Sequence, residues 1–466
     1  MSTRITVAVV GGGIAGLVAA RELALGGAEV SLYERASELG GRVRSTALAG
    51  APIDIGAEAF ATRGGAVMQL IEELRLASEV VRPEPLGSWV VTEERSLPLP
   101  PGGALGIPSA PLGRASRRVL GTWGALRAAL EPLLPRDRTV DRATTLADLV
   151  RRRLGERVLD RLVRPVALGV YSTAPEELSL SRLRDLAEAY EREGSLIRAA
   201  RSLRDSSSAA GGAVAALRGG MAGLVTALAA DLERLGVSIH TGHSVEHLGT
   251  FAPDGAEPAD TILLATPEVT TRALLASSDA DSVGDDQPRE LQPGTRVEVI
   301  ALAIEDSRLD AAPRGTGALV APGTPGIAAK ALTHVTAKWA DRRAMRDSSV
   351  HVVRLSYGRA GSEPETVALS DAEAYELARQ DASRILGVEL RADAIRDAAR
   401  KIWVTSTATD ANQPLTPQPG IGLAGDWVHG TGLASVVPGA RQAARALLAE
   451  AQHTLNESDE SQVRST

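Results

Sequence analysis

The feature that most constrains this chain is a glycine-rich loop close to its N-terminus. A β-branched run over residues 4–10 stops abruptly at a glycine triplet, and apolar residues then recur at helical spacing up to Gly26. The loop reads Gly-x-Gly-x-x-Gly over Gly11–Gly16. Its first glycine allows a tight turn, the second lets backbone N–H groups approach a pyrophosphate, and the third lets the helix pack against the strand. A strand, this loop and a helix in that order predict an α/β protein with a Rossmann-like dinucleotide site.

An acidic residue stands where such a site needs one. Residues 29–33 predict a second strand, and Glu34 follows it, 18 residues after Gly16. At that distance a carboxylate can accept hydrogen bonds from the ribose hydroxyls of an adenosine. We therefore interpret the loop as a dinucleotide site and not as a glycine turn that serves only packing.

Two further glycine motifs indicate which dinucleotide binds. Gly40–Arg42 form a Gly-Gly-Arg turn soon after Glu34, a spacing with no role in a plain NAD dehydrogenase. A second close approach of the backbone suits a longer, extended ligand such as a flavin dinucleotide, whose ribityl chain would run past this turn. Near the C-terminus, Asp426 can bond a ribityl hydroxyl, although it could also serve only to cap a turn. Gly430–Leu433 then allow backbone approach before the last helix, whose N-terminus favours negative charge at the flavin carbonyl.

Composition excludes several kinds of chemistry. Cysteine is absent, which removes disulfides, thiolate nucleophiles, iron–sulfur clusters and Cys-ligated zinc, so redox chemistry needs a bound cofactor. The net charge of -7 and the few aromatic side chains argue against a nucleic-acid partner. His240, His243 and His247 straddle a turn without a converging carboxylate, so we expect no metal site. The uncharged run Ile5–Ala20 is too short to span a bilayer; we expect a cytoplasmic protein, with peripheral membrane contact left open.

The remaining chain divides by its hydrophobic pattern. Residues 141–207 repeat apolar side chains at helical spacing, and we expect Arg151–Arg153 on a solvated helix face. Residues 297–356 carry strand and turn signals, which predict a separate β layer, and a last helix is expected over 440–451. Three segments look like mobile connections, namely 202–212, 277–294 and the tail after Gln452.

The glycine motifs taken together resemble the flavin amine oxidase superfamily. The residues that carry this resemblance are Gly11–Gly16, Gly40–Arg42, Ile53–Glu58, Gly219–Met221 and Gly425–Asp426. Within the superfamily the chain resembles the bacterial protoporphyrinogen/coproporphyrinogen oxidase family over Arg95–Pro108, Leu146–Arg153, Pro165–Leu180, Gly315–Gly317 and Leu355–Gly361. The match covers most of the chain, and Gly169–Tyr171 is its most family-specific stretch.

The resemblance implies an α/β architecture, α+β in part, with three domains. A discontinuous FAD-binding domain would comprise residues 1–76, 219–268 and 402–452. A β-rich substrate domain would comprise residues 77–105 and 269–401, and a helical domain residues 106–218. Residues 453–466 would form a flexible tail.

The resemblance also implies which residues surround the flavin. The positions that match the family's motifs are Gly11, Gly12, Gly13, Ile14, Ala15, Gly16, Glu34, Arg35, Gly41, Arg42, Gly56, Ala57, Glu58, Ala59, Val245, Trp403, Gly425, Asp426, Gly432, Leu433 and Ala434. Gly169 would lie beside the substrate. The chain departs from the family's pattern over residues 405–419 and at Gly432–Ala434, which bears on the substrate more than on FAD.

The function that the resemblance implies is FAD-dependent oxidation of coproporphyrinogen III to coproporphyrin III in haem biosynthesis. Hydride would pass from a macrocycle carbon to flavin N5, protons would be lost, and dioxygen would reoxidise the flavin to give peroxide, until six electrons had left. Coproporphyrinogen is favoured because the match is best to the Gram-positive-type branch and because Trp89 stands where some animal relatives carry an arginine.

No catalytic side chain is expected, because cysteine is absent and no histidine belongs to a recognisable pair of base and orienting group. The alternatives are a protoporphyrinogen IX oxidase, another flavin amine or carotenoid-type oxidase, and a non-catalytic flavin-fold binding protein. The sequence leaves the oligomeric state open.

Overall fold

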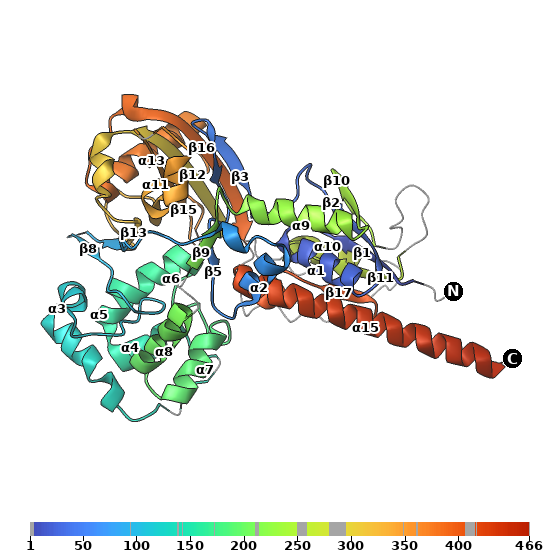
Figure 1. Ribbon diagram of the computed structural model, residues 1–466. Coiled ribbons are helices and arrows are strands. Elements are labelled where there is room, and N and C mark those ends of the chain that lie inside the picture. The colour runs from blue at the N-terminus through green and yellow to red at the C-terminus, as the bar shows by residue number, and fades with distance from the viewer. Residues whose placement is uncertain are drawn as a thin grey trace.

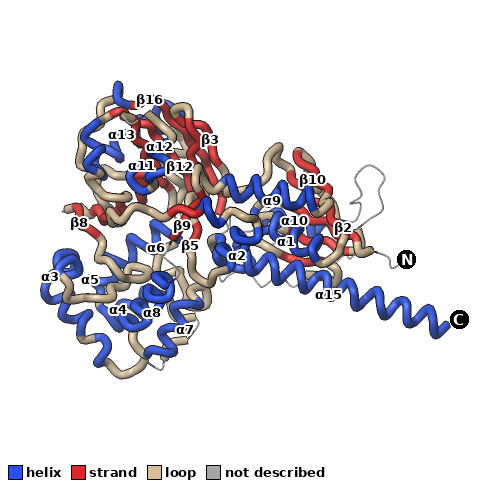
Figure 2. Tube along the Cα trace, viewed as in Figure 1, coloured by secondary structure: helices blue, strands red, loops and turns tan. Residues whose placement is uncertain are grey.

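The computed structural model describes residues 4–465 except 94, 138, 142, 172, 210–213, 249–258, 279–294, 348, 360–361, 406–414 and 416. The described chain forms three bodies (Figure 1). One contains both ends of the chain, the second is rich in strands, and the third is built almost entirely of helices (Figure 2). The chain is an α/β protein, as the sequence predicted.

The first body is built on a five-stranded parallel sheet. Its strands, in spatial order, are β10 (Ser238–Thr241), β2 (Glu29–Glu34), β1 (Thr6–Val10), β11 (Thr261–Leu264) and β17 (Ile421–Leu423). α1 (Ile14–Leu25) packs against α9 (Ala222–Arg234) and α15 (Leu433–Ser465). α10 (Glu268–Ser278) contributes Leu274 to an apolar cluster with Val10 and Leu264. Strands from segments far apart in the sequence therefore meet in one sheet, and their carboxyl ends share one edge.

The second body is a seven-stranded sheet with α13 (Asp371–Leu386) against one face. In spatial order the strands are β16 (Ile395–Thr405), β12 (Thr295–Glu305), β15 (Val350–Tyr357), β14 (Ala331–His334), β13 (Gly317–Val320), β7 (Trp89–Val91) and β8 (Ser96–Pro98). The pairs are antiparallel except β13 with β7. Small side chains such as Ala301 and Ala303 face away from α13 and join the core of the first body. They allow the sheet to approach the hairpin of β3 (Ser45–Leu48) and β4 (Ala51–Asp54) closely.

The third body is helical and has its own core. Its elements are α3 (Arg114–Ala129), α4 (Leu146–Leu154), α5 (Glu156–Val158), a π-helical turn (Leu159–Val163), α6 (Arg164–Tyr171), α7 (Arg184–Glu193) and α8 (Leu196–Ala209). The arginine triplet was expected to be solvated, and that expectation is wrong for Arg153. Arg153 is buried against Glu131, at an N–O distance of 2.7 Å, and also donates to the Pro135 carbonyl. Glu131 lies in a separate 3-10 turn and not on the same helix as Arg153, so helical periodicity alone could not reveal this ion pair.

Short elements connect the three bodies. β5 (Phe60–Ala61), β9 (Val214–Leu217) and β6 (Val80–Val81) form a small sheet. The other helices are α2 (Ala66–Glu73), α11 (Val335–Lys338), α12 (Ala340–Ala344) and α14 (Asp426–His429), with 3-10 turns at Ala77–Glu79, Glu131–Leu133, Ser307–Ala311 and Ala392–Ala394.

The C-terminal segment differs from its prediction. The helix predicted over 440–451 begins earlier, at Leu433, and continues to Ser465, so the tail expected to be flexible continues the helix. Residues 440–466 contain neither Gly nor Pro, which removes the usual helix breakers.

α10 begins at the proposed start of the second substrate-domain segment, yet it packs with the first body. Of the other segments expected to be mobile, 210–212 and 279–294 lie outside the described residues.

Candidate active site

The glycine loop lies between β1 and α1, at the carboxyl edge of the parallel sheet. Gly11 has φ +108°, and a Cβ there would lie 2.7 Å from the Ala265 carbonyl oxygen. A Cβ on Gly16 would lie 1.8 Å from the Gly11 carbonyl oxygen. Both positions therefore need glycine because of the protein's own packing.

Gly13 differs from its neighbours because the space beside it is open. Its φ of -73° suits any L-residue, and a Cβ there would meet no atom within 4 Å. Gly13 is also the N-cap of α1 and offers no side chain to the first N–H groups of the helix. Those donors and the helix dipole thus face open space, which fits a pyrophosphate group.

Glu34 is held at the end of β2 by two backbone donors. One carboxylate oxygen accepts from the Gly12 N–H and the other from the Ala36 N–H, each at 2.8 Å. A carboxylate has about four acceptor positions, so two remain for hydroxyl groups of a ligand. The arrangement fits the ribose-binding role expected from the sequence.

We predict that Glu34→Lys weakens FAD binding by about 10- to 150-fold, because losing hydrogen bonds to a charged acceptor costs about 1.5–3 kcal/mol. The measurement is a titration of apoprotein with FAD. Glu29→Lys makes the same charge change at the exposed start of the same strand and should leave the affinity unchanged. Equal affinity in both variants would remove the ribose role.

The second glycine turn is joined to the glycine loop and to the C-terminal motif. Gly40 donates its N–H to the Gly12 carbonyl at 2.8 Å, and a Cβ on Gly41 would lie 3.2 Å from the Gly13 Cα. The Arg42 guanidinium contacts the Asp426 carboxylate at 2.5 Å. Two neighbouring motifs and a third that lies 384 residues beyond Arg42 therefore line one continuous strip, which fits an extended dinucleotide.

Gly56 lies where the first and second bodies meet. A Cβ there would approach the Arg42 carbonyl oxygen to 2.0 Å and the Trp403 ring to 3.4 Å. The Trp403 indole N–H donates to the Ile55 carbonyl at 2.9 Å, and the Ala57 N–H donates to the Arg42 carbonyl at 2.9 Å. Trp403 of the seven-stranded sheet is thereby fixed against the loop that contains Ile55 and Gly56.

Glu58 is the centre of an ion-pair cluster that sequence reasoning missed. Its carboxylate contacts Lys338 Nζ at 2.5 Å and Arg354 at 2.9 Å, and it accepts from the Trp339 indole N–H at 2.9 Å. Arg354 also donates to the Gly56 carbonyl at 2.8 Å. Burial raises the pKa of Glu58, but the two cations and their hydrogen bonds outweigh it and lower the pKa to about 2. The cluster, hereafter the Glu58 cluster, therefore stays ionised and ties the β-rich body to the cofactor side.

The other predicted residues occupy varied environments. Arg35 is exposed after β2, and Val245 lies in the loop after β10 and packs on the cluster that contains Val10. Gly425 (φ +148°) precedes α14 and Gly432 (φ +92°) precedes α15, at whose start Leu433 and Ala434 pack on the main core. Ala59 packs there too. Gly169 lies in α6, which packs against β13.

Two buried histidines lie on the face of the seven-stranded sheet that packs on α13. His334 pairs with Val353 and His351 with Ile304, and both partners belong to the core under α13. Residues directly opposite in antiparallel strands share a face. Arg354, one residue along from Val353, points to the other face and reaches Glu58. Burial and the neighbouring His351 and Arg343 charges lower the pKa of His334 to about 3, so this ring is neutral.

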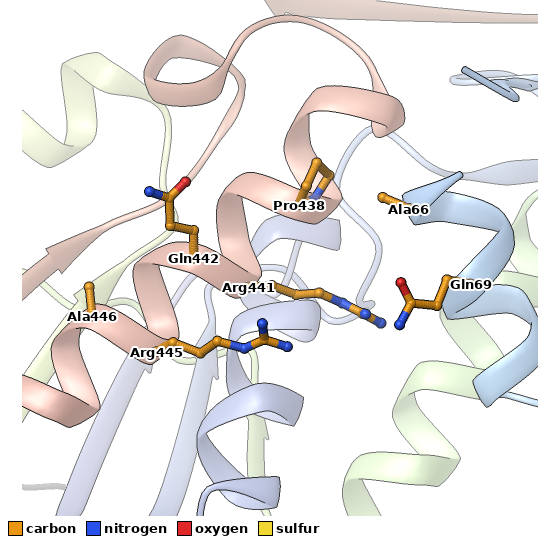
Figure 3. Close-up of a pocket in the computed structure, with 7 residues that line it drawn as sticks. All are labelled: Ala66, Gln69, Pro438, Arg441, Gln442, Arg445 and Ala446. Carbon is orange, nitrogen blue, oxygen red and sulfur yellow. The ribbon is translucent and has the colours of Figure 1, made fainter. Parts of the chain in front are cut away.

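Two cavities lie apart from these residues. One of about 550 Å³ runs between α2 and α15 and is lined by Gln69, Arg441 and Arg445 (Figure 3). Both arginines already form ion pairs within the protein: Arg441 contacts Glu22 and Glu73, and Arg445 contacts Glu22. The second cavity, of about 370 Å³, lies between the β7–β8 hairpin and the helical body.

Among the described residues, no three His, Asp or Glu side chains converge as a metal site. No helix in the described part of the chain is long and apolar enough to cross a bilayer.

Comparison with known proteins identifies the family. Residues 14–448 match the family described as flavin containing amine oxidoreductase. Coproporphyrinogen III oxidase of Mycobacterium tuberculosis (strain ATCC 25618 / H37Rv) is 30% identical over 94% of this chain and 96% of that protein. The Bacillus subtilis (strain 168) protein of the same name is 25% identical, over 82% of this chain and 83% of that protein.

Solved structures confirm the fold. A crystal structure from Exiguobacterium sp. 255-15, named provisionally as a protoporphyrinogen oxidase, has a TM-score of 0.75 at 22% identity and covers 96% of this chain and 99% of its own. Cyclohexylamine oxidase from Brevibacterium oxydans has a TM-score of 0.63 at 15% identity and covers 97% of this chain and 100% of its own. The sequence resemblance to the bacterial protoporphyrinogen/coproporphyrinogen oxidases is confirmed by the relatives. The chain therefore belongs to the flavin containing amine oxidoreductase family and is an FAD-dependent oxidoreductase.

Proposed function

We propose that this enzyme oxidises coproporphyrinogen III to coproporphyrin III, with dioxygen as the acceptor, in the cytoplasm. The observation that carries the proposal is the similarity to proteins named coproporphyrinogen III oxidase along nearly the whole chain. The tobacco protein named protoporphyrinogen oxidase matches over only 37% of this chain, which favours coproporphyrinogen as the substrate. The reaction removes six hydrogen atoms from the macrocycle, and three molecules of dioxygen would accept them as three of hydrogen peroxide.

Bound FAD would supply the hydride acceptor, and the chain would hold and shield it. Gly11–Gly16 and Glu34 would bind the adenosine diphosphate portion, and Arg42 and Asp426 the ribityl portion. Val299 and Ala301 of β12 turn an apolar face toward the cofactor-side core, and apolar walls exclude water from the reacting atoms. Gly169 of α6 would lie beside the macrocycle.

No single side chain is expected to be indispensable for proton transfer. Ala substitutions at His334, His351 and His429 should each leave peroxide production per bound flavin within about tenfold of the parent, or about 1.4 kcal/mol of barrier. His334 and His351 lie on the face of the seven-stranded sheet that packs on α13, away from the core shared with the first body. His429 packs directly on Gly439 of α15. A thousandfold loss at any one of them, with FAD still bound, would reveal a dedicated acid or base.

The deciding experiment is anaerobic flavin reduction by coproporphyrinogen III, protoporphyrinogen IX, a panel of amines and a carotenoid precursor. We expect coproporphyrinogen III to bleach the flavin fastest, and admission of air to restore its colour and release peroxide. Faster bleaching by protoporphyrinogen IX would reassign the substrate. Bleaching by amines or the carotenoid precursor alone would reject porphyrinogen oxidation, and a flavin that no substrate reduces would favour a binding protein.

A further inference from the structure

The charged members of the Glu58 cluster do not balance. One carboxylate, Glu58, is shared by two cations, Lys338 and Arg354, whose side chains are only 20% and 8% exposed. Asp54 also feels the charge of Arg354, but it pairs with the buried Arg342 at 3.5 Å. A cation that burial takes out of water is costly without a counter-charge. The cluster therefore calls for further negative charge beside it.

Arg354 also has a hydrogen-bond donor that the protein does not use. One terminal nitrogen of its guanidinium donates to Glu58 at 2.9 Å and the other to the Gly56 carbonyl at 2.8 Å. The Nε–H is buried and meets no acceptor among the described residues. Native proteins rarely leave a buried donor unpaired, because it has lost its bonds to water. An acceptor on a bound group would satisfy this donor.

The position of Arg354 indicates which group that is. Arg354 lies opposite Ala301 on the face of the seven-stranded sheet that joins the core of the first body. Gly56, which accepts its second bond, lies against the Arg42 carbonyl, and Arg42 contacts Asp426 at the end of the strip. A flavin dinucleotide laid along the strip, with its ribityl chain at Arg42, would bring its ring to Gly56. The unbalanced charge and the unused donor would then both face the ring.

We propose that the Glu58 cluster raises the reduction potential of the bound flavin, with Arg354 as the cation that faces the ring. Two electrons and one proton convert the neutral oxidised flavin into its anionic reduced form. A cation beside the ring stabilises that added negative charge and so favours the reduced form. Glu58 is a positioning residue that holds both cations and offsets one of them. The proposal rests on the placement of FAD along the strip and not on the identity of the substrate.

The test is the reduction potential of the FAD-loaded protein, measured by anaerobic reduction with xanthine and xanthine oxidase beside a reference dye. Arg354→Gln and Lys338→Gln each remove one cation and leave Glu58 with one partner, so each should lower the potential. Glu58→Gln removes the negative charge alone and should raise it. We expect each change to alter the ratio of reduced to oxidised flavin at least about tenfold, which is about 30 mV for two electrons.

The opposite signs separate a charge effect from a loss of packing. All three substitutions weaken the same contact between the bodies, so a purely structural role predicts shifts of one sign. Two controls make the same charge changes elsewhere in the second body. Arg314→Gln removes a cation that donates to the Ile385 carbonyl of α13, and Glu376→Gln removes a carboxylate at the surface of α13. Both should keep the parent's potential.

Several results would overturn the proposal. These are a parent-like potential in Arg354→Gln and Lys338→Gln, shifts of one sign in all three variants, and equal shifts in the controls. The two cation variants support each other, since either one that retains FAD gives the sign. Retention of FAD by Gly13→Val would instead show that the dinucleotide lies elsewhere. No porphyrinogen enters the test, so its result is independent of the proposed function.

Discussion

Gly13→Val should produce a folded protein that carries no FAD. The open space beside Gly13 means that the valine side chain meets no protein atom at Cβ, and the φ of -73° suits it. The same side chain would stand where the pyrophosphate approaches the first N–H groups of α1. Losing two charge-assisted hydrogen bonds costs about 3–6 kcal/mol, which is at least about a hundredfold in affinity. The measurement is flavin absorbance per chain after purification, with the thermal midpoint as the check on folding.

Two comparison variants separate ligand binding from packing. Gly223→Val makes the same change in α9, where a Cβ would lie 3.8 Å from the nearest side chain, and it should keep FAD. Gly16→Val should fail to fold, because its Cβ would lie 1.8 Å from the Gly11 carbonyl oxygen. Stoichiometric FAD in Gly13→Val would contradict the placement of the pyrophosphate at this loop.

The geometry around the glycine loop could be predicted because its determinants are local in sequence. The β-branched run, the three glycines and Glu34 lie within one βαβ unit, where spacing alone sets the geometry. The sequence predicted α1 and the strands β1 and β2 to within a few residues for the same reason. The predicted residues that lie close together in the structure include Gly12, Gly13, Glu34 and Gly41.

The ion pairs that join distant parts of the chain could not be predicted from the sequence. Glu58 lies 280 residues from Lys338 and 296 from Arg354, and Arg42 lies 384 from Asp426. A pairing over such distances depends on the tertiary fold, and 48 arginines offer too many candidates. One signal was present, because the chain has only three lysines and one of them, Lys338, precedes a tryptophan. This lysine beside a tryptophan is the sequence feature that points toward the Glu58 cluster.

Glu58→Leu should destabilise the enzyme by about 3–5 kcal/mol, because it leaves Lys338 and Arg354 as partly buried charges without a carboxylate. The exposed fractions of the Glu58, Lys338 and Arg354 side chains are 13%, 20% and 8%, so water cannot replace the lost partner fully. The measurement is urea unfolding of the FAD-loaded protein at neutral pH. Glu376→Gln is the matched control. Contacts with Arg379 and Gln380 lower the Glu376 pKa to about 2 as well, but this carboxylate lies at the surface, where such pairs contribute about 0–1 kcal/mol.

The stabilisation from the Glu58 cluster should also depend on pH. The pKa of Glu58 is about 2 in the folded protein, below its ordinary value of 4.5, so its contribution is fully present above pH 4.5. It is lost as the pH falls through about 2, because protonation then removes the carboxylate that holds both cations. The difference in unfolding free energy between the parent and Glu58→Gln should therefore be constant from neutral pH down to about 5 and shrink below it. A difference that stays constant in acid, or that equals the Glu376→Gln control at neutral pH, would show that the two bodies are held together by apolar packing instead.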